Sequence, residues 1–219
     1  MKKSILALCA LTLTAGLVAC GGGGTSTYTI GGYVAGLQYP GLVLTNNLSD
    51  DVTLTPRPVD STGAVQNVTY QFAKQLDYGD PYSVTVKTPP AHQVCEPVSS
   101  ALDQTSRTSD TAGRLSVINA AFVCGLATHT IGGTVSGLAA DGLILNNGSN
   151  STAAIAKDAT TGAYPTTFTF GAEVTYKQTY GVTVLQNPTG QTCTVKNGAG
   201  EMLDDPITTI AVTCVNNPV

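Results

Sequence analysis

A sequence repeat divides most of the chain into two copies. Residues 28–37, Tyr-Thr-Ile-Gly-Gly-Tyr-Val-Ala-Gly-Leu, return at 129–138 as His-Thr-Ile-Gly-Gly-Thr-Val-Ser-Gly-Leu. Further along, residues 82–86 match 180–184, and Gln93 matches Gln191. Because each copy of an internal repeat is one structural unit, the sequence predicts two similar domains, at 28–126 and 127–219.

Each copy has the pattern of an all-β domain. In the second copy, short runs of alternating apolar and polar residues are separated by Gly, Asn and Pro, which favours strands over helices. Seven short strands in one domain are typical of an immunoglobulin-like or prealbumin-like β-sandwich. The chain has no Trp, so the Cys-Trp-Cys pattern of true immunoglobulin domains is absent. The strands are predicted at 130–136, 142–146, 153–157, 166–170, 180–185, 192–196 and 208–215.

Four cysteines lie inside the copies and allow three disulfide pairings. Cys95 matches Cys193, and Cys124 matches Cys214 if the first copy carries extra residues in the Ser/Thr-rich stretch 99–113. The simplest pairing is one bond within each copy, Cys95 to Cys124 and Cys193 to Cys214. Bonds between the copies are the alternative. The spacings lack the Cys-x-x-Cys clusters of zinc sites, so we expect no metal and no cofactor.

The N-terminus has the layout of a secretory leader. Two lysines precede a short apolar segment that ends in Leu-Val-Ala-Cys at residues 17–20. These four residues resemble the lipobox of bacterial lipoproteins, which implies cleavage after Ala19 and a diacylglycerol thioether on Cys20. We expect a signal peptide at 1–19, followed by a lipidated Cys20 and a Gly-rich tether at 20–27. An ordinary secretory signal is the alternative.

The composition limits the partners. The chain has 10 basic and 14 acidic residues and a net charge of −4, whereas binding to nucleic acid requires a basic stripe. The expected partner is a membrane, through the lipid on Cys20. Gly21 follows Cys20 and resembles the sorting position of lipoproteins sent to the outer membrane. The sequence does not predict which face of that membrane the protein occupies. An envelope protein or a glycan is the alternative further partner.

No catalytic constellation stands out. His92 and His129 occupy the positions of Gly190 and Tyr28 in the other copy, so we interpret both as surface histidines. The acidic pairs 50–51 and 204–205 are interpreted as solvated turn residues, because no calcium-loop pattern surrounds them. The Gly-Gly pairs precede strand patterns and not a helix, which predicts a β-bulge or close packing under a neighbouring strand.

Tyrosines are the candidates for binding, because exposed aromatic rings often carry the energy of an interface. Tyr33 and Tyr39 align with Thr134 and Ala140, so they are specific to the first copy, whereas Tyr78 aligns with Tyr176. We take Tyr33, Tyr39 and Tyr78 as possible binding residues, with ordinary edge or core positions as the alternative.

The repeated Ile-Gly-Gly-x-Val-x-Gly-Leu opening, the Gly-Leu-[Val/Ile]-Leu run and the Gln-x-Cys near the end of each copy resemble a tandem β-repeat of predicted bacterial lipoproteins and exported proteins. That resemblance implies fold and location but no activity. The expected function is a lipid-anchored, non-catalytic spacer or interaction module of the cell envelope. The alternatives are a glycan- or protein-binding accessory lipoprotein and an envelope enzyme.

Overall fold

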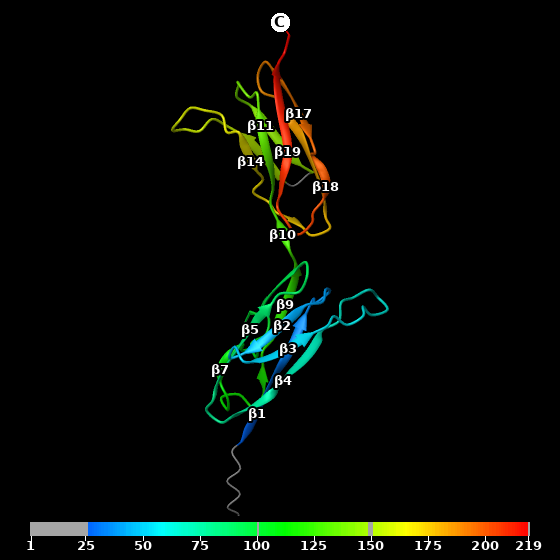
Figure 1. Cartoon of the computed structure of the whole chain (residues 1–219), viewed down its shortest axis with the longest axis vertical. Coiled ribbons are helices and arrows are strands. Elements are labelled where there is room, and N and C mark those ends of the chain that lie inside the picture. Colours follow the sequence, from blue (N-terminus) through cyan, green and yellow to red (C-terminus); the bar gives the residue numbers. More distant parts are fainter. Residues whose placement is uncertain (1–25, 100, 149–150, 219) are drawn as a thin grey trace, which may run out of the picture.

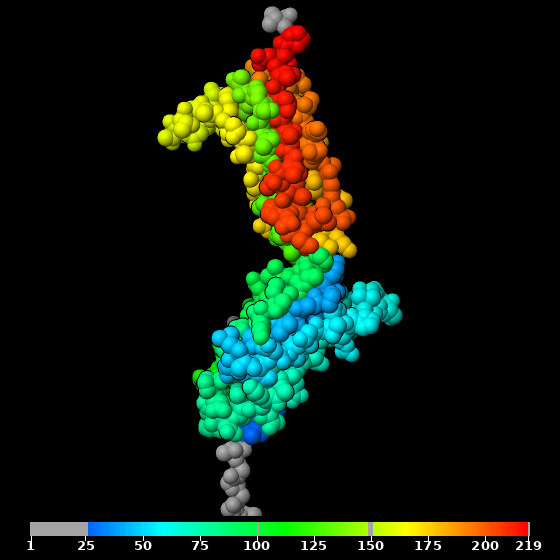
Figure 2. All heavy atoms as spheres, in the orientation of Figure 1, coloured from blue at the N-terminus to red at the C-terminus, as the bar shows by residue number. Residues whose placement is uncertain are grey.

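The computed structural model describes residues 26–99, 101–148 and 151–218 and shows two β-sandwich domains in line (Figures 1 and 2). The predicted leader, Cys20 and most of the tether lie outside these residues. Within them the regular structure consists of strands, which confirms the all-β fold class. No helix in this part of the chain is long and apolar enough to cross a membrane.

In the first domain two sheets form the sandwich. One has the strand order β4-β1-β9-β6, with β8 also paired to β1, and the other has the order β3-β2-β5-β7. The strands are β1 (Thr27–Ala35), β2 (Leu42–Asn46), β3 (Asp50–Leu54), β4 (Val68–Asp77), β5 (Pro81–Thr88), β6 (Gln93–Pro97), β7 (Ser109–Thr111), β8 (Ile118–Asn119) and β9 (Phe122–Leu126).

The second domain repeats this topology. Its sheets have the orders β14-β11-β19-β17 and β13-β12-β16-β18, and a short pair, β10 with β15, lies beside them. In both domains the first long strand, β1 or β11, runs parallel to the last one, β9 or β19. The strands are β10 (Thr128–His129), β11 (Ile131–Ser136), β12 (Leu143–Asn147), β13 (Ser151–Ile155), β14 (Thr167–Thr169), β15 (Val174–Thr175), β16 (Thr179–Gln186), β17 (Gln191–Lys196), β18 (Ala199–Glu201) and β19 (Ile207–Asn216).

The inward residues form two separate hydrophobic cores among the described residues. In the second domain these include Phe168 and Phe170 of the β14 region and the β19 residues Ile210, Val212 and Cys214, all buried as the period-two pattern predicts. Burial of apolar area of this kind is the main favourable term in folding.

Each domain contains one disulfide, in the pairing that the repeat predicts. Cys95 of β6 bonds to Cys124 of β9, and Cys193 of β17 bonds to Cys214 of β19. Both pairs sit directly opposite each other in neighbouring antiparallel strands, with Cα atoms 4.0 Å apart. In the chain-entropy model, closing loops of this length stabilises each domain by roughly 3 to 4 kcal/mol.

The Gly-Gly pairs mark a shared irregularity in the first long strand. The pairing register shifts between Thr29 and Gly31 where β1 pairs with β4, and between Ile131 and Gly133 where β11 pairs with β19. A Cβ on Gly32 would collide with the backbone of Ala120, and one on Gly133 with the backbone of Ile210. The prediction of a bulge with close backbone packing is therefore confirmed.

Candidate functional site

The joint between the two domains is the most elaborate polar and aromatic site that the described residues form. Only Ala127 separates β9 of the first domain from β10 of the second. Its N–H donates to the carbonyl of His92 in the first domain, at 2.8 Å, and its carbonyl accepts from the N–H of Tyr176 in the second, also at 2.8 Å. The connecting residue is thus hydrogen-bonded to both domains.

Three aromatic rings fill the space beside Ala127. The ring of His92 stacks on the ring of Tyr176, with centroids 4.2 Å apart and an interplanar angle of 7°. Tyr39 presents its edge to both, at 4.8 Å from His92 and 5.9 Å from Tyr176. Tyr176 is only 8% exposed as a result. Stacked and edge-to-face pairs of this kind add about 0.5–1.5 kcal/mol each beyond the area they bury.

Charged groups of the second domain complete the joint. Nδ1 of His92 lies 2.7 Å from Oδ1 of Asp204. Because a carboxylate can only accept, Nδ1 carries the hydrogen and donates it. The Nζ atom of Lys177 lies 5.7 Å from the ring centroid of Tyr176 and 6.0 Å from that of Tyr39, which are cation–π distances.

A buried glutamine sets the position of Tyr39. Gln93 is 3% exposed, and its Oε1 accepts from the N–H groups of Gln38 and Tyr39, at 2.8 and 3.0 Å. Its Nε2 donates to the carbonyl of Gly36 at 2.8 Å. Gln191 makes the equivalent three bonds in the second domain. The matched glutamines of the repeat therefore hold the loop that follows the first long strand in each domain.

The structure corrects the interpretation of His92 from the sequence. His92 is not a free surface histidine, because its side chain is 27% exposed and stacked against the other domain. Asp204 is 53% exposed in a bend, as predicted, and it also accepts from His92. His129 is half-buried in β10, and its Nε2 atom is buried. Asp50 is 8% exposed and accepts from the N–H of Lys74, so it too differs from the prediction.

A hollow lies over the Gly-Gly pair on the outer face of each domain. In the first domain it measures about 360 Å³ and is lined by Tyr33, Tyr70 and Val117 around Gly31 and Gly32. The hollow at the same place in the second domain measures about 180 Å³. A neighbouring hollow of about 490 Å³, lined by Leu115 and Thr105 among others, shares Val117 with the larger one. The first domain thus has much more open space at this position.

The extra residues of the first copy border this space. Tyr33 donates its hydroxyl hydrogen to Oδ2 of Asp103 at 3.2 Å, and Asn119 donates to the same oxygen at 3.1 Å. Partial burial raises the pKa of Tyr33, and the hydrogen bond and charge of Asp103 add to this. The pKa of Asp103 is lowered, chiefly because the hydroxyl and the N–H of Thr105 donate to its carboxylate.

The three predicted tyrosines lie at three different places. Tyr33 borders the hollow, Tyr39 belongs to the domain joint, and Tyr78 is 71% exposed in the turn after β4. They do not form one binding surface. The repeat contained a signal for the joint, because Tyr39 and His92 both replace small residues, Ala140 and Gly190, of the other copy.

Comparison with models of known protein families finds no match, and comparison with curated proteins finds no similar sequence. Among the residues described, no group of three or more His, Cys, Asp or Glu side chains could hold a metal ion. Function must therefore be argued from the joint, the hollow and the N-terminal sequence.

Proposed function

We propose that this protein is a lipid-anchored, non-catalytic component of the bacterial cell envelope, in which two β-sandwich domains form a stiff arm attached through Cys20. The observation that carries the proposal is the domain joint. A flexible string of domains needs only a linker, whereas here Ala127 is hydrogen-bonded on both sides and three rings pack across the boundary. A joint of this kind suits a spacer that holds its far end away from a membrane.

The disulfides and the N-terminal sequence support export. Disulfides persist in oxidising compartments outside the cytoplasm, and the lipobox resemblance places the anchor at Cys20. Two or three acyl chains hold a protein stably on a membrane, since each buried CH₂ contributes about 0.8 kcal/mol. An outer-membrane location follows from the resemblance at Gly21, and either face of that membrane is compatible with it.

Replacement of Cys20 tests the anchor. Cys20→Ser should abolish metabolic labelling by a radioactive fatty acid and release the protein from the membrane fraction, while both disulfides still form. The control is Ser26→Ala, a change in the exposed residue just before β1. Continued acylation of the Cys20→Ser variant would refute the lipid anchor. Protease treatment of intact cells then separates display at the surface from a periplasmic location.

A second candidate function is binding of a glycan or a protein by the first domain. The observation that favours it is the hollow beside Tyr33, which is twice as large as its counterpart in the second domain. Tyr33→Thr introduces the residue that the second copy has at this position, so the fold should tolerate it. Binding on a glycan array that disappears in this variant would support the candidate, and an array without signal for the unaltered protein would count against it.

A further inference from the structure

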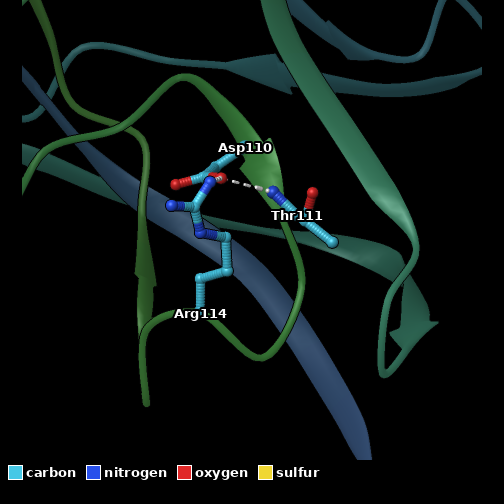
Figure 3. A network of polar contacts seen from close by, with 3 residues as sticks. All are labelled: Asp110, Thr111 and Arg114. Carbon is cyan, nitrogen blue, oxygen red and sulfur yellow. Dashed lines mark hydrogen bonds and ion pairs between the residues drawn. The ribbon is translucent and has the colours of Figure 1, made fainter.

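The end of the first domain at which β1 begins carries two neighbouring tyrosine rings. Tyr78 is 71% exposed, and Tyr28 is partly buried against the core. We use the name tether-end surface for Tyr28, Tyr78, Gly113 and Arg114. The rings of Tyr28 and Tyr78 lie 6.5 Å apart, and a Cβ on Gly113 would collide with the ring of Tyr78. Arg114 folds back towards Asp110, with Nη1 3.2 Å from Oδ1, and the same oxygen accepts from the N–H of Thr111 (Figure 3).

This surface is the counterpart of the one by which the second domain docks on the first. Tyr78 aligns with Tyr176 in the repeat. The next residue donates its N–H to Ala112 in the first domain and to Met202 in the second, at 3.0 and 2.9 Å. Yet Tyr176 is 8% exposed and Tyr78 is 71% exposed. One position in the fold thus carries a buried docking ring in one domain and an uncovered ring in the other.

A second copy of the chain is not a suitable occupant. The second domain rests on Tyr39 and His92, and the far end of the second domain has Ala140 and Gly190 at these positions. The far end of the second domain therefore lacks both rings against which Tyr78 of another copy would pack. Head-to-tail stacking of further copies would have no equivalent of the joint.

The membrane is within reach of this surface. Cys20 precedes Thr27, the first residue of β1, by seven positions, and seven residues span at most about 25 Å. Tyrosine has an apolar ring and a polar hydroxyl, so it is favoured in the headgroup layer of a bilayer. The side chain of Arg114 is 72% exposed and has a long apolar stem below its charge, which suits the same layer.

We propose that the tether-end surface rests in the headgroup layer of the membrane that holds Cys20, with the exposed ring of Tyr78 as the main contact and the partly buried ring of Tyr28 beside it. This inference depends on the lipid anchor proposed above. Asp77, Asp80 and Asp110 lie at the same end of the domain, and Arg114 is the cation among them. Contact is consequently made by the rings and not by attraction to anionic lipid, and it persists on zwitterionic vesicles and in high salt.

A single tryptophan can report on this contact, because the chain has none. The full chain carrying Tyr78→Trp is acylated in a bacterial host and reconstituted in phosphatidylcholine vesicles with or without brominated acyl chains. Bromine should quench the emission about twofold, since the ring lies at headgroup depth. Tyr164→Trp is the matched control, because Tyr164 lies in a loop of the second domain and bonds to Asp141. Its emission should not change.

The outcomes separate this inference from the anchor on which it depends. If the variant is acylated and vesicle-bound but Trp at position 78 is not quenched, the inference is overturned while the anchor stands. If Cys20 carries no lipid, both fall. Equal quenching at positions 78 and 164 would mean that the arm lies flat, which also overturns it. Protection of position 78 only in native envelopes would assign the surface to a protein partner instead.

Discussion

At the scale of single residues, the Gly-Gly pairs have the clearest physical role. Gly32 leaves no room for a Cβ, because the carbonyl and the peptide group of Ala120 occupy that place. The hydroxyl of Tyr70 donates to this same carbonyl, and burial raises the pKa of Tyr70. The carbonyl of Ala120 is therefore held between Gly32 and the hydroxyl of Tyr70. A side chain at position 32 would fit only if the backbone moved.

Gly32→Ala should consequently destabilise the first domain by about 3 kcal/mol, the upper part of the range for overpacking, because backbone cannot move aside as a side chain can. Gly125→Ala is the control. Gly125 also lies in a strand of the same sheet, but nothing stands within 4 Å of a Cβ built there, so this change should be neutral or stabilising. Urea unfolding followed by circular dichroism measures both. Equal stabilities of the two variants would refute the packing argument.

At the scale of elements, the strands follow from local patterns. All seven strands predicted for the second copy are present with small shifts of their ends, because period-two alternation reflects one buried face. The alternation pattern does not predict three short strands, β10, β15 and β18. They are two or three residues long and depend on pairing with distant segments, for which a short window of sequence has no signal.

For the extra residues of the first copy, in the stretch 99–113, the sequence predicts a loop and no contacts. The structure shows why it is ordered. Asp103 accepts from Thr105, Tyr33 and Asn119, so one carboxylate ties the loop to β1 and β8. These partners lie up to 70 positions apart in the chain. Composition alone does not identify these partners, although Tyr33 differs from Thr134, its counterpart in the second copy.

The charge of Asp103 makes this loop sensitive to acid. Its pKa is lowered in the folded chain by the hydrogen bonds from Thr105, so its contribution to stability is complete above the unfolded value of about 3.9 and is lost as the pH falls through the lower, folded value. NMR shifts of the Thr105 amide should titrate with a midpoint below 3.9. Asp103→Asn should abolish this step, and a midpoint at or above 3.9 would contradict the assignment.

At the scale of the whole molecule, the sequence pattern does not determine how the two domains contact each other. The repeat predicts two similar units, but not which end of one contacts which end of the other. The residues of the joint come from distant parts of both copies, Tyr39 and His92 from one and Tyr176 and Asp204 from the other. The two copies differ at the positions that form the joint. The second domain has Ala140 and Gly190 where the first domain has the rings of Tyr39 and His92.

The stiffness of the arm can be tested with the residue that the second copy itself supplies. His92 has a φ of 58°, and its counterpart Gly190 has a φ of 70°. His92→Gly therefore removes the stacked ring and the bond to Asp204 while relieving a left-handed conformation that costs a non-glycine residue roughly 1–2 kcal/mol. The first domain should keep or gain stability, whereas the joint should loosen. These opposite effects distinguish a broken joint from a damaged fold.

NMR relaxation of backbone amides measures the joint directly. In the unaltered protein both domains should tumble with one correlation time, as a single elongated body. In His92→Gly the two domains should show separate, shorter correlation times, because only the hydrogen bonds of Ala127 and the contacts of Tyr39 with Tyr176 and Lys177 still hold them. Tyr164→Ala, which removes a half-buried ring from a loop of the second domain, should leave the tumbling unchanged. If the His92→Gly variant still tumbles as one body, the aromatic stack does not stiffen the arm, and the hydrogen bonds of Ala127 are sufficient.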